Sequence, residues 1–512
     1  KEENELKLLK LLFKRVTLVI FAILIQAIWF VLQIVNFSNY FIGLHYIFLL
    51  LSIVIVLAII KRERHIDTKL PWIIVILLFP LFGGVLYIFA GATLYSSPSL
   101  KKINKTREKV KETLHQDENV LNEIKKIDKD VYSQISYISN YIGYPTYNNS
   151  RIEYWDSGEE TYKNMLVELE KAEKFIFIEF FIISEGKMWQ GILDILQKKV
   201  KQGVDVRVIY DDIGSIGGLP NNYYKKLRKM GIKAIAFNRL VPVLAVFMNN
   251  RDHRKIMVID GNIVFSGGLN LADEYINEKE RFGHWKDNGI MIKGEAVWNF
   301  TSMFLGIWNA YINEDKEFTK YRPTITTVSD SNGFIAPYGE NPLDDEIVGE
   351  NIYLNIINQA KEYVYIFTPY LIIDSEMITA LTLARKRGVD IRIVTPGIPD
   401  KKIVFTLTRS YYEMLIKDGV KIYEYTPGFI HSKVFVSDDK VATVGTLNLD
   451  YRSLYLHFEC GTYIFESSVI KNIKEDAINT IDISKEIKMK DCKVGILKSI
   501  FQSILRIFAP LM

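Results

Sequence analysis

Two stretches of this 512-residue sequence follow one pattern: HRKIMVIDGNIVFSGGLN at 253–270 and HSKVFVSDDKVATVGTLN at 431–448. Each has a histidine, a lysine two positions later, an aspartate five positions after that, and then a glycine and an asparagine. The shared positions are His253, Lys255, Asp260, Gly267 and Asn270 in the first, and His431, Lys433, Asp438, Gly445 and Asn448 in the second. Since the chain has only 7 histidines, the repeat indicates one kind of site built twice.

Each motif lies on a predicted strand. The segments IMVID and VFVSD are rich in β-branched residues, which favour strands. Residues i and i+2 of a strand face the same side. His253 is therefore expected to project with Lys255, and His431 with Lys433.

The two motifs, brought together, suit a phosphodiester. They supply two imidazoles, two ammonium groups and two carboxamides around one point. Ammonium and amide groups stabilise negative charge on the non-bridging oxygens in the transition state. One histidine can attack phosphorus while the other protonates the leaving oxygen. The expected phosphate-binding residues are Lys255, Asn270, Lys433 and Asn448.

The doubled H-x-K-x4-D with a trailing G-[GST]-x-N resembles the motif of the phospholipase D superfamily. Much of the remaining sequence is similar to the bacterial cardiolipin synthases within it. The resemblance implies transfer of a phosphatidyl group from one phosphatidylglycerol to another, giving cardiolipin and glycerol through a phosphohistidine. It assigns the nucleophile to His253 and the acid/base to His431, and pseudo-symmetry leaves the reverse open. The implied catalytic set is His253, Lys255, Asp260, His431, Lys433 and Asp438.

Acidic residues accompany both motifs. In the resembled family, an acid after each motif bonds the far ring nitrogen of a catalytic histidine, which fixes its tautomer. Asp287 and Glu459 hold this position, and Glu459 is the firmer expectation because its neighbours form a cleaner strand. By strand parity Asp260 and Asp438 face away from the histidines, so within the implied set these two are expected to be structural.

A longer internal repeat surrounds the motifs. The predicted strand, helix and strand span 174–183, 191–203 and 204–215 in the first half, and 363–372, 377–388 and 389–397 in the second. A repeat of this length indicates a duplicated domain. We predict an α/β fold with two phospholipase D-like domains, 146–322 and 323–487. Each has a mixed sheet between helix layers, and a pseudo-two-fold axis brings both motifs to one seam.

Residues 1–95 read as a membrane region. The apolar runs 16–35 and 40–60 are each long enough to cross a bilayer as a helix. Basic residues flank the pair, and basic flanks stay cytoplasmic, so an in–out–in hairpin is expected. These flanking residues are Lys7, Lys10, Lys14, Arg15, Lys61, Arg62, Arg64 and Lys69. The localisation that follows is a multi-pass protein of the bacterial cell membrane with cytoplasmic catalytic domains.

A third apolar run at 71–91 is interrupted near its middle by Pro80 and by Gly83 and Gly84. Proline removes a helical hydrogen bond, and glycine loosens the backbone. We expect a re-entrant or interfacial hairpin that starts and ends on the cytoplasmic side. The alternative is a third full crossing with reversed topology.

Segments outside the two domains have amphipathic patterns. Residues 96–145 predict a helical linker, for which a solvated spacer is an equal alternative. Residues 488–512 predict a C-terminal helix with Leu497, Ile500 and Ile504 on one face and basic residues opposite, typical of a membrane interface. A core-packing helix is the alternative. The apolar stretch 238–250 is expected to line the mouth of the site, and burial in the core is the alternative.

Composition excludes several function classes. The net charge is only +4, and no basic tract with interleaved aromatic residues adjoins either motif, so no nucleic-acid partner is expected. The cysteines, Cys460 and Cys492, form no metal or redox motif. No cofactor and no metal ion is expected, because the lysines supply the positive charge. The expected partners are phosphatidylglycerol, cardiolipin and the bilayer, and a homo-oligomer is left open.

Other functions remain compatible with the motifs. A phospholipase D that passes the phosphatidyl group to water, or a synthase using another alcohol, would need the same residues. A nuclease of the same superfamily has no use for the apolar N-terminal runs. A non-enzymatic scaffold is disfavoured because both motifs are intact.

Overall fold

The computed structural model describes residues 38–61, 66–87, 98–239, 249–326, 328, 330–331, 333–344 and 346–511. The chain forms two compact units. One comprises 1–98, 240–250 and 504–512, and the other comprises 99–239 and 251–503. The predicted membrane helix at 16–35 lies outside the described residues, as does most of the stretch 238–250.

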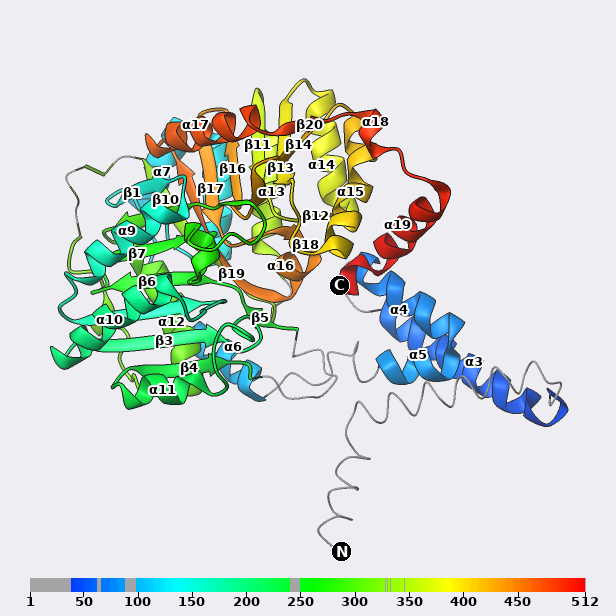
Figure 1. The fold of residues 1–512 in the computed structure, drawn as a ribbon, viewed down its shortest axis with the longest axis horizontal. Helices are drawn as coiled ribbons and strands as arrows, with labels where there is room; N and C mark the ends of the chain where they lie inside the picture. Colours follow the sequence, from blue (N-terminus) through cyan, green and yellow to red (C-terminus); the bar gives the residue numbers. More distant parts are fainter. Residues whose placement is uncertain are drawn as a thin grey trace, which may run out of the picture. The chain divides into compact units, whose positions relative to one another are not determined.

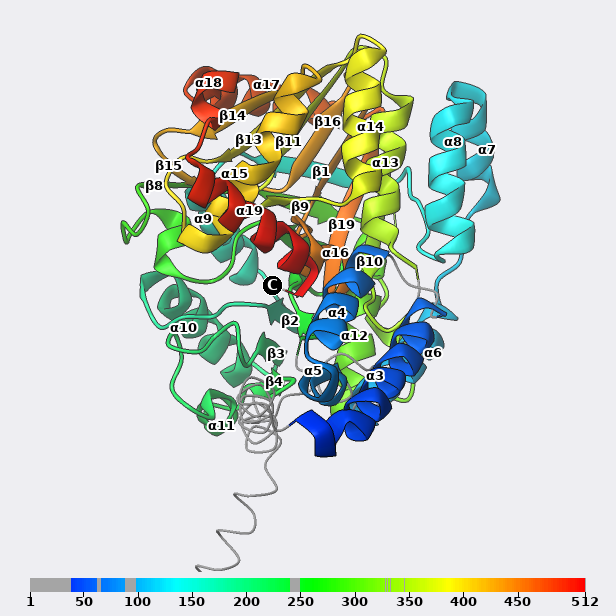
Figure 2. The same cartoon turned by 90° about the vertical axis from the view of Figure 1, so that its right-hand side faces the viewer.

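The described part of the first unit includes the helices α3 (Ser38–Ile60), α4 (Ile66–Leu78) and α5 (Pro80–Leu86) (Figure 2). The run at 71–91 breaks at Phe79, as the proline after it requires. Helix α5 then packs against α4, and a Cβ on Gly83 would lie 2.5 Å from the Val75 carbonyl oxygen. Glycine therefore permits the contact between these two helices.

Helix α3 coincides with the predicted second apolar helix. Across the described ranges, however, no helix combines the length and the apolar character needed to cross a bilayer. The predicted transmembrane helix at 40–60 is therefore not confirmed.

The second unit contains two large sheets (Figure 1). One has seven strands and the other nine, and seven strands of the larger sheet follow the same order as those of the smaller. The first sheet runs β1 (Arg151–Trp155), β9 (Gly289–Lys293), β7 (Ile263–Gly267), β6 (Lys255–Ile259), β2 (Phe175–Phe180), β3 (Asp205–Asp211) and β4 (Lys233–Phe237). The second runs β10 (Phe334–Glu340), β19 (His457–Phe465), β17 (Val441–Gly445), β16 (Val434–Ser437), β11 (Tyr363–Phe367), β13 (Asp390–Pro396) and β14 (Lys421–Tyr425), with β20 (Lys485–Ile487) added at its edge.

Both sheets are mixed, as predicted. Strands β2, β3 and β4 pair in parallel, as do β11, β13 and β14, and every other pairing within these arrays is antiparallel. The strands that carry the motifs, β6–β7 and β16–β17, are hairpins at equivalent places. The duplication read from the sequence is therefore present in the fold.

Helices surround these sheets (Figure 1). The 96–145 region holds α6 (Pro98–Lys111), α7 (Glu118–Ile127), α8 (Lys129–Ser136) and the π-helix η2 (Tyr137–Tyr141). The first half has α9 (Gly158–Leu169), α10 (Lys187–Lys201), α11 (Tyr223–Lys229), α12 (Val297–Tyr311), and 3-10 turns at Asp273–Ile276 and Thr319–Tyr321. The second has α13 (Val348–Gln359), α14 (Ser375–Lys386), α15 (Lys402–Lys417), α16 (Tyr451–Tyr455), α17 (Val469–Asp482) and α18 (Met489–Cys492). Helix α19 (Ile496–Phe508) and a 3-10 turn (Ala509–Leu511) follow.

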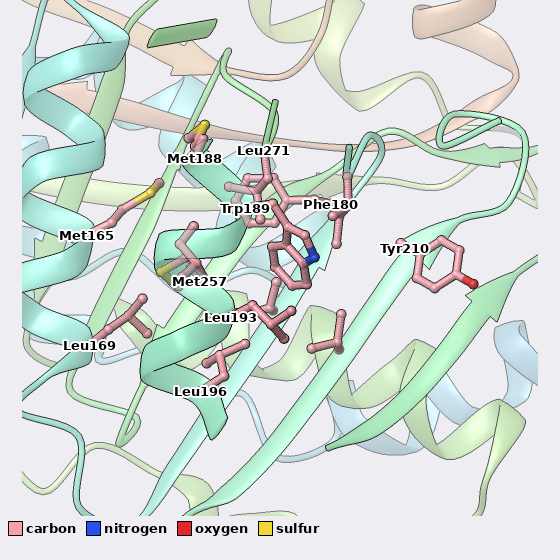
Figure 3. Close-up of a cluster of buried hydrophobic side chains, with 14 of the residues drawn as sticks. Met165, Leu169, Phe180, Met188, Trp189, Leu193, Leu196, Tyr210, Met257 and Leu271 are labelled. Atoms are coloured by element: carbon pink, nitrogen blue, oxygen red, sulfur yellow. The ribbon is translucent and has the colours of Figure 1, made fainter. Parts of the chain in front are cut away.

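Amphipathic helices close the sheet faces. In α10 the apolar residues recur every three or four positions, so one stripe of the helix faces the sheet. Figure 3 shows Trp189, Leu193 and Leu196 of this helix among side chains from α9 and β2. The indole nitrogen of Trp189 donates to the Tyr223 hydroxyl at 2.8 Å, so this large buried ring leaves no polar atom unsatisfied.

Helix α12 lies between the halves. All its residues from Val297 to Ala310 are buried, and it contacts β6 of the first sheet and β10 of the second. The Asn299 amide donates to the carbonyl oxygens of Pro145 and Pro337. An apolar helix buried on all sides therefore joins the two halves into one body.

Short strands cross between the halves and position the motifs. Strand β5 (Arg251–Asp252) of the first half pairs with β19, and β8 (His284–Lys286) pairs with β15 (Gly428–Ile430) of the second. A smaller pair, β12 (Leu371–Ile372) with β18 (Leu449–Asp450), lies within the second half. Strand β5 leads directly into His253 and pairs with β19, which contains Glu459. Strand β8 leads directly into Asp287 and pairs with β15, which leads into His431.

Candidate active site

The motif histidines occupy equivalent places at the crossing strands. His253 follows β5, and its backbone N–H donates to the Phe458 carbonyl at 2.9 Å. His431 follows β15, and its backbone N–H donates to the Lys286 carbonyl at 2.8 Å. Each histidine is thus fixed by backbone from the opposite half, at the seam that the repeat predicted.

Each histidine pairs with the acid of the opposite half. His253 Nδ1 lies 2.8 Å from Glu459 Oε1 and 2.9 Å from Oε2. His431 Nδ1 lies 2.8 Å from Asp287 Oδ2. Both ring contacts use Nδ1, so in each ring Nε2 is the nitrogen that can reach a phosphorus atom. The expected hydrogen bonds to an acid are present, and Asp287 makes its contact as closely as Glu459 does.

The two acids are held differently. Glu459 accepts from the hydroxyls of Ser453 and Thr446, each at 2.5 Å. Asp287 accepts from the backbone N–H of Asn288. Gly268 is the counterpart of Thr446, and a Cβ there would lie 2.0 Å from Asp287 Oδ1. The shorter acid therefore requires a glycine where the longer acid uses a threonine.

Both motif lysines are buried beside the histidines. Lys255 Nζ donates to the His253 carbonyl at 2.5 Å, and Lys433 Nζ donates to the His431 carbonyl and lies 2.9 Å from His431 Nδ1. Burial lowers the pKa of Lys255 to about 8 and that of Lys433 to about 7. An anion placed between them relieves this penalty, because opposite charge favours the protonated ammonium.

Burial also favours neutral histidines. It lowers the pKa of His431 to about 4, with the charge of Lys433 as the next cause, and holds the pKa of His253 well below its ordinary value. Burial raises the pKa of Glu459 well above the usual range. Burial acts in the same direction on Asp287, but His431 and Lys433 outweigh it and lower the pKa of that carboxyl. A neutral imidazole has the lone pair that a nucleophile needs.

The motif asparagines differ between the halves. Asn270 Oδ1 accepts from the Ile182 N–H at 3.1 Å, and its Nδ2 donates to the Tyr275 hydroxyl at 2.7 Å. The Tyr275 ring in turn contacts the His431 ring. In Asn448 the buried Oδ1 has no hydrogen-bond partner among the described residues. Asn270 thus supports neighbouring groups, and a phosphate contact from either asparagine stays a prediction.

The motif aspartates lie away from the reacting groups. Asp260 follows β6 at the end opposite His253, and its carboxylate accepts from the backbone N–H groups of residues 173–175. Asp438 accepts equivalently from residues 361–363. The prediction that Asp260 and Asp438 belong to the catalytic set is therefore wrong. Their carboxylates cap the starts of β2 and β11, and strand parity directs them away from the histidines.

One histidine that the motif does not include joins the site. The ring centroid of His457 lies 5.6 Å from that of His253, and its Nδ1 lies 3.7 Å from Glu459 Oε1. His457 and Glu459 are residues i and i+2 of β19, so they share a face. The same parity that links His253 to Lys255 applies to His457 and Glu459, and sequence reasoning missed it.

Comparison with protein families agrees with this geometry. A model described as "Cardiolipin synthase, PLD-like domain" matches residues 165–308 and 353–480, the two halves that build the site. The chain belongs to the phospholipase D superfamily. A "Phospholipase_D-nuclease N-terminal" model also matches residues 50–91 of this superfamily member.

Individual relatives place the chain among cardiolipin synthase-like members. It is 32% identical over 470 residues to a cardiolipin synthase of Alkalihalophilus pseudofirmus, covering 91% of this chain and 93% of that one. It is 31% identical over 498 residues to a cardiolipin synthase of Geobacillus kaustophilus, covering 96% and 99%. A Streptococcus mutans protein without a stated activity is 44% identical over 458 residues, covering 89% and 99%.

A solved structure supports the fold. The crystal structure of phosphatidylserine synthase from Haemophilus influenzae matches with a TM-score of 0.52, covering 70% of this chain and 93% of that one. At 15% identity this likeness concerns the fold alone. The predicted duplicated α/β architecture is confirmed for the catalytic unit.

Proposed function

We propose that this phospholipase D superfamily member is a cardiolipin synthase. It would transfer a phosphatidyl group from one phosphatidylglycerol to a second, releasing glycerol. The observation that carries the proposal is the pair of buried histidines, each bonded through Nδ1 to an acid of the opposite half. The relatives from Alkalihalophilus pseudofirmus and Geobacillus kaustophilus named as cardiolipin synthases support the choice of substrate.

In the first step, Nε2 of His253 attacks phosphorus and a P–N bond forms. The bond from phosphorus to the glycerol oxygen breaks, and His431 gives that oxygen a proton. The low pKa of His431 belongs to the site without substrate. A phosphodiester anion beside the ring raises this pKa, so substrate binding itself supplies the general acid.

In the second step, His431 accepts a proton from the terminal hydroxyl of a second phosphatidylglycerol. The oxygen attacks phosphorus, the P–N bond breaks, and cardiolipin leaves with His253 restored. Lys255 and Lys433 stabilise the charge on the non-bridging oxygens in both steps. A covalent intermediate divides one difficult displacement into two easier ones. The assignment of His253 as nucleophile rests on the family resemblance.

One product assay tests the proposal. The purified chain is incubated in detergent micelles with phosphatidylglycerol as the only lipid, and the products are separated. Cardiolipin with an equal amount of glycerol supports the proposal. Phosphatidic acid without cardiolipin would instead support hydrolysis. If cardiolipin does not form but a phosphatidyl ester forms when another alcohol is added, the enzyme uses a different acceptor.

We also propose that the protein is a multi-pass protein of the bacterial cell membrane, with its catalytic unit on the cytoplasmic side. The apolar helix α3 and the break in the run at 71–91 support a re-entrant arrangement. The apolar face of α19, on which Leu497 is 85% exposed, suits the interface.

Cysteine labelling in sealed vesicles tests this topology. Lys61→Cys and Lys105→Cys are made in a background lacking Cys460 and Cys492. Labelling of both from the cytoplasmic side supports the proposal. Labelling from opposite sides would show that 71–91 crosses the membrane.

A further inference from the structure

His457 has no task in the transfer reaction. It is only 9% exposed, and neither of its ring nitrogens has a hydrogen-bond partner among the described residues. Burying such a ring without partners is costly. The equivalent position of the first half, two residues before Asp287, is Trp285, whose ring centroid lies 5.6 Å from that of His431. A ring therefore fills both places, but only His457 carries nitrogens that can act as ligands.

The neighbours of His457 complete a ligand set. One ligand atom from each of His253, His457 and Glu459 lies within 4.8 Å of the others, and all three side chains are buried. The distances from Glu459 Oε1 are 2.8 Å to His253 Nδ1 and 3.7 Å to His457 Nδ1. Ligands about 2.0–2.1 Å from a tetrahedral ion lie roughly 3.3 Å apart, a value between these two.

The surroundings of Glu459 suit a ligand. The hydroxyls of Ser453 and Thr446 donate to its two oxygens and fix the carboxylate plane. Such outer hydrogen bonds orient ligands in metal sites. Two imidazoles and one carboxylate with an open fourth position are a donor set typical of zinc.

We propose that His253, His457 and Glu459 form a binding site for a divalent transition-metal ion such as zinc, and that the ion inhibits the enzyme. A metal on Nδ1 of His253 displaces its hydrogen bond to Glu459. The neutral ring then carries its proton on Nε2, so Nε2 has no lone pair for phosphorus. The site is thus inhibitory, and the transfer reaction does not use the ion.

The binding test is independent of the transfer reaction. The full-length chain, in detergent without lipid and with Cys492→Ser to remove a partly exposed thiol, is titrated with zinc and separately with cobalt(II) as an optical probe. We expect His457→Asn to lower the zinc affinity by about 100-fold, on the scale of losing a key metal-site group, and to abolish the visible cobalt band. The matched control His115→Asn removes an exposed histidine and should change neither.

In the binding test, either of two results would overturn the proposal: no zinc binding by the unsubstituted chain, or equal binding by His457→Asn. Thermal unfolding confirms that each variant is folded, and His457→Gln replaces His457→Asn if the asparagine variant is not folded.

Inhibition of cardiolipin formation by zinc is then measured relative to the metal-free rate of each variant. Zinc should inhibit the parent and His115→Asn, and EDTA should reverse this. Equal inhibition of His457→Asn would also refute the site.

Discussion

At the scale of single residues, the two histidines have roles that cannot replace each other within one reaction cycle. We expect His253→Ala and His431→Ala each to lower the rate of cardiolipin formation from phosphatidylglycerol at least about 100-fold, the usual worth of a general acid or base. His284→Ala, which removes a histidine bonded to Tyr425, is the control and should keep its rate. The two-histidine mechanism fails if either site variant retains more than a hundredth of the parent rate.

The acids act on the reaction only through the histidines they orient. Asp287→Asn and Glu459→Gln keep the shape of each side chain but remove the charge that favours Nδ1–H. We expect each to lower kcat by about 10²–10⁴-fold, as for other histidines deprived of a carboxylate partner. KM should change far less, because neither acid is placed to touch the phosphate. An effect confined to KM would instead assign these acids to substrate binding.

The lysines predict a pH dependence. Lys433 and Lys255, with pKa values of about 7 and about 8, lose their protons in the free enzyme as the pH rises through this range. Phosphate binding needs the charged forms, so kcat/KM should fall as the pH rises above about 7, where Lys433 loses its proton. Lys433→Arg stays charged and should move this basic limb to higher pH. The measurement is kcat/KM as a function of pH for the parent and for Lys433→Arg. If the basic limb lies at the same pH in both, Lys433 is not its source.

At the scale of elements, Asp260 and Asp438 hold the starts of β2 and β11. Each carboxylate accepts three backbone N–H groups, and such bonds to charged groups stabilise by about 1.5–3 kcal/mol each when made. We expect Asp260→Ala and Asp438→Ala to lower the thermal unfolding temperature while the rate per folded molecule stays in the same order of magnitude. Loss of rate without loss of stability would return these residues to the catalytic set.

Strand parity explains what the sequence made predictable at this scale. Strand parity placed Lys255 beside His253 and directed Asp260 away, and the internal repeat predicted both sheets. Neither pattern revealed that Glu459 bonds His253 and that Asp287 bonds His431. Those pairings depend on how β5 and β8 cross between the halves, which is a long-range packing outcome. His457 was missed because its partner in the first half is Trp285, so the repeat carries no histidine signal there.

At the scale of the whole molecule, one chain assembles one composite site from its two halves. A mixture of the full-length variants His253→Ala and His431→Ala should therefore stay inactive, because neither chain contains both histidines. The assay is cardiolipin formation after joint reconstitution, with the parent chain diluted into either variant as the positive control. Recovered activity would mean that chains exchange halves in an oligomer.

The crossing strands have an evolutionary consequence. A duplicated gene ordinarily leaves each copy free to drift, since the other maintains the function. Here each histidine relies on a carboxylate encoded in the other repeat, so neither repeat can be deleted without breaking both pairs. Gly268 and Thr446 add a constraint within each repeat: the glycine admits the shorter acid of its own repeat, whereas the threonine supports the longer acid of its own repeat. A partial exchange that gave one repeat the threonine of the other while keeping its own shorter acid would therefore be harmful, which favours retention of the differences between two halves of common origin.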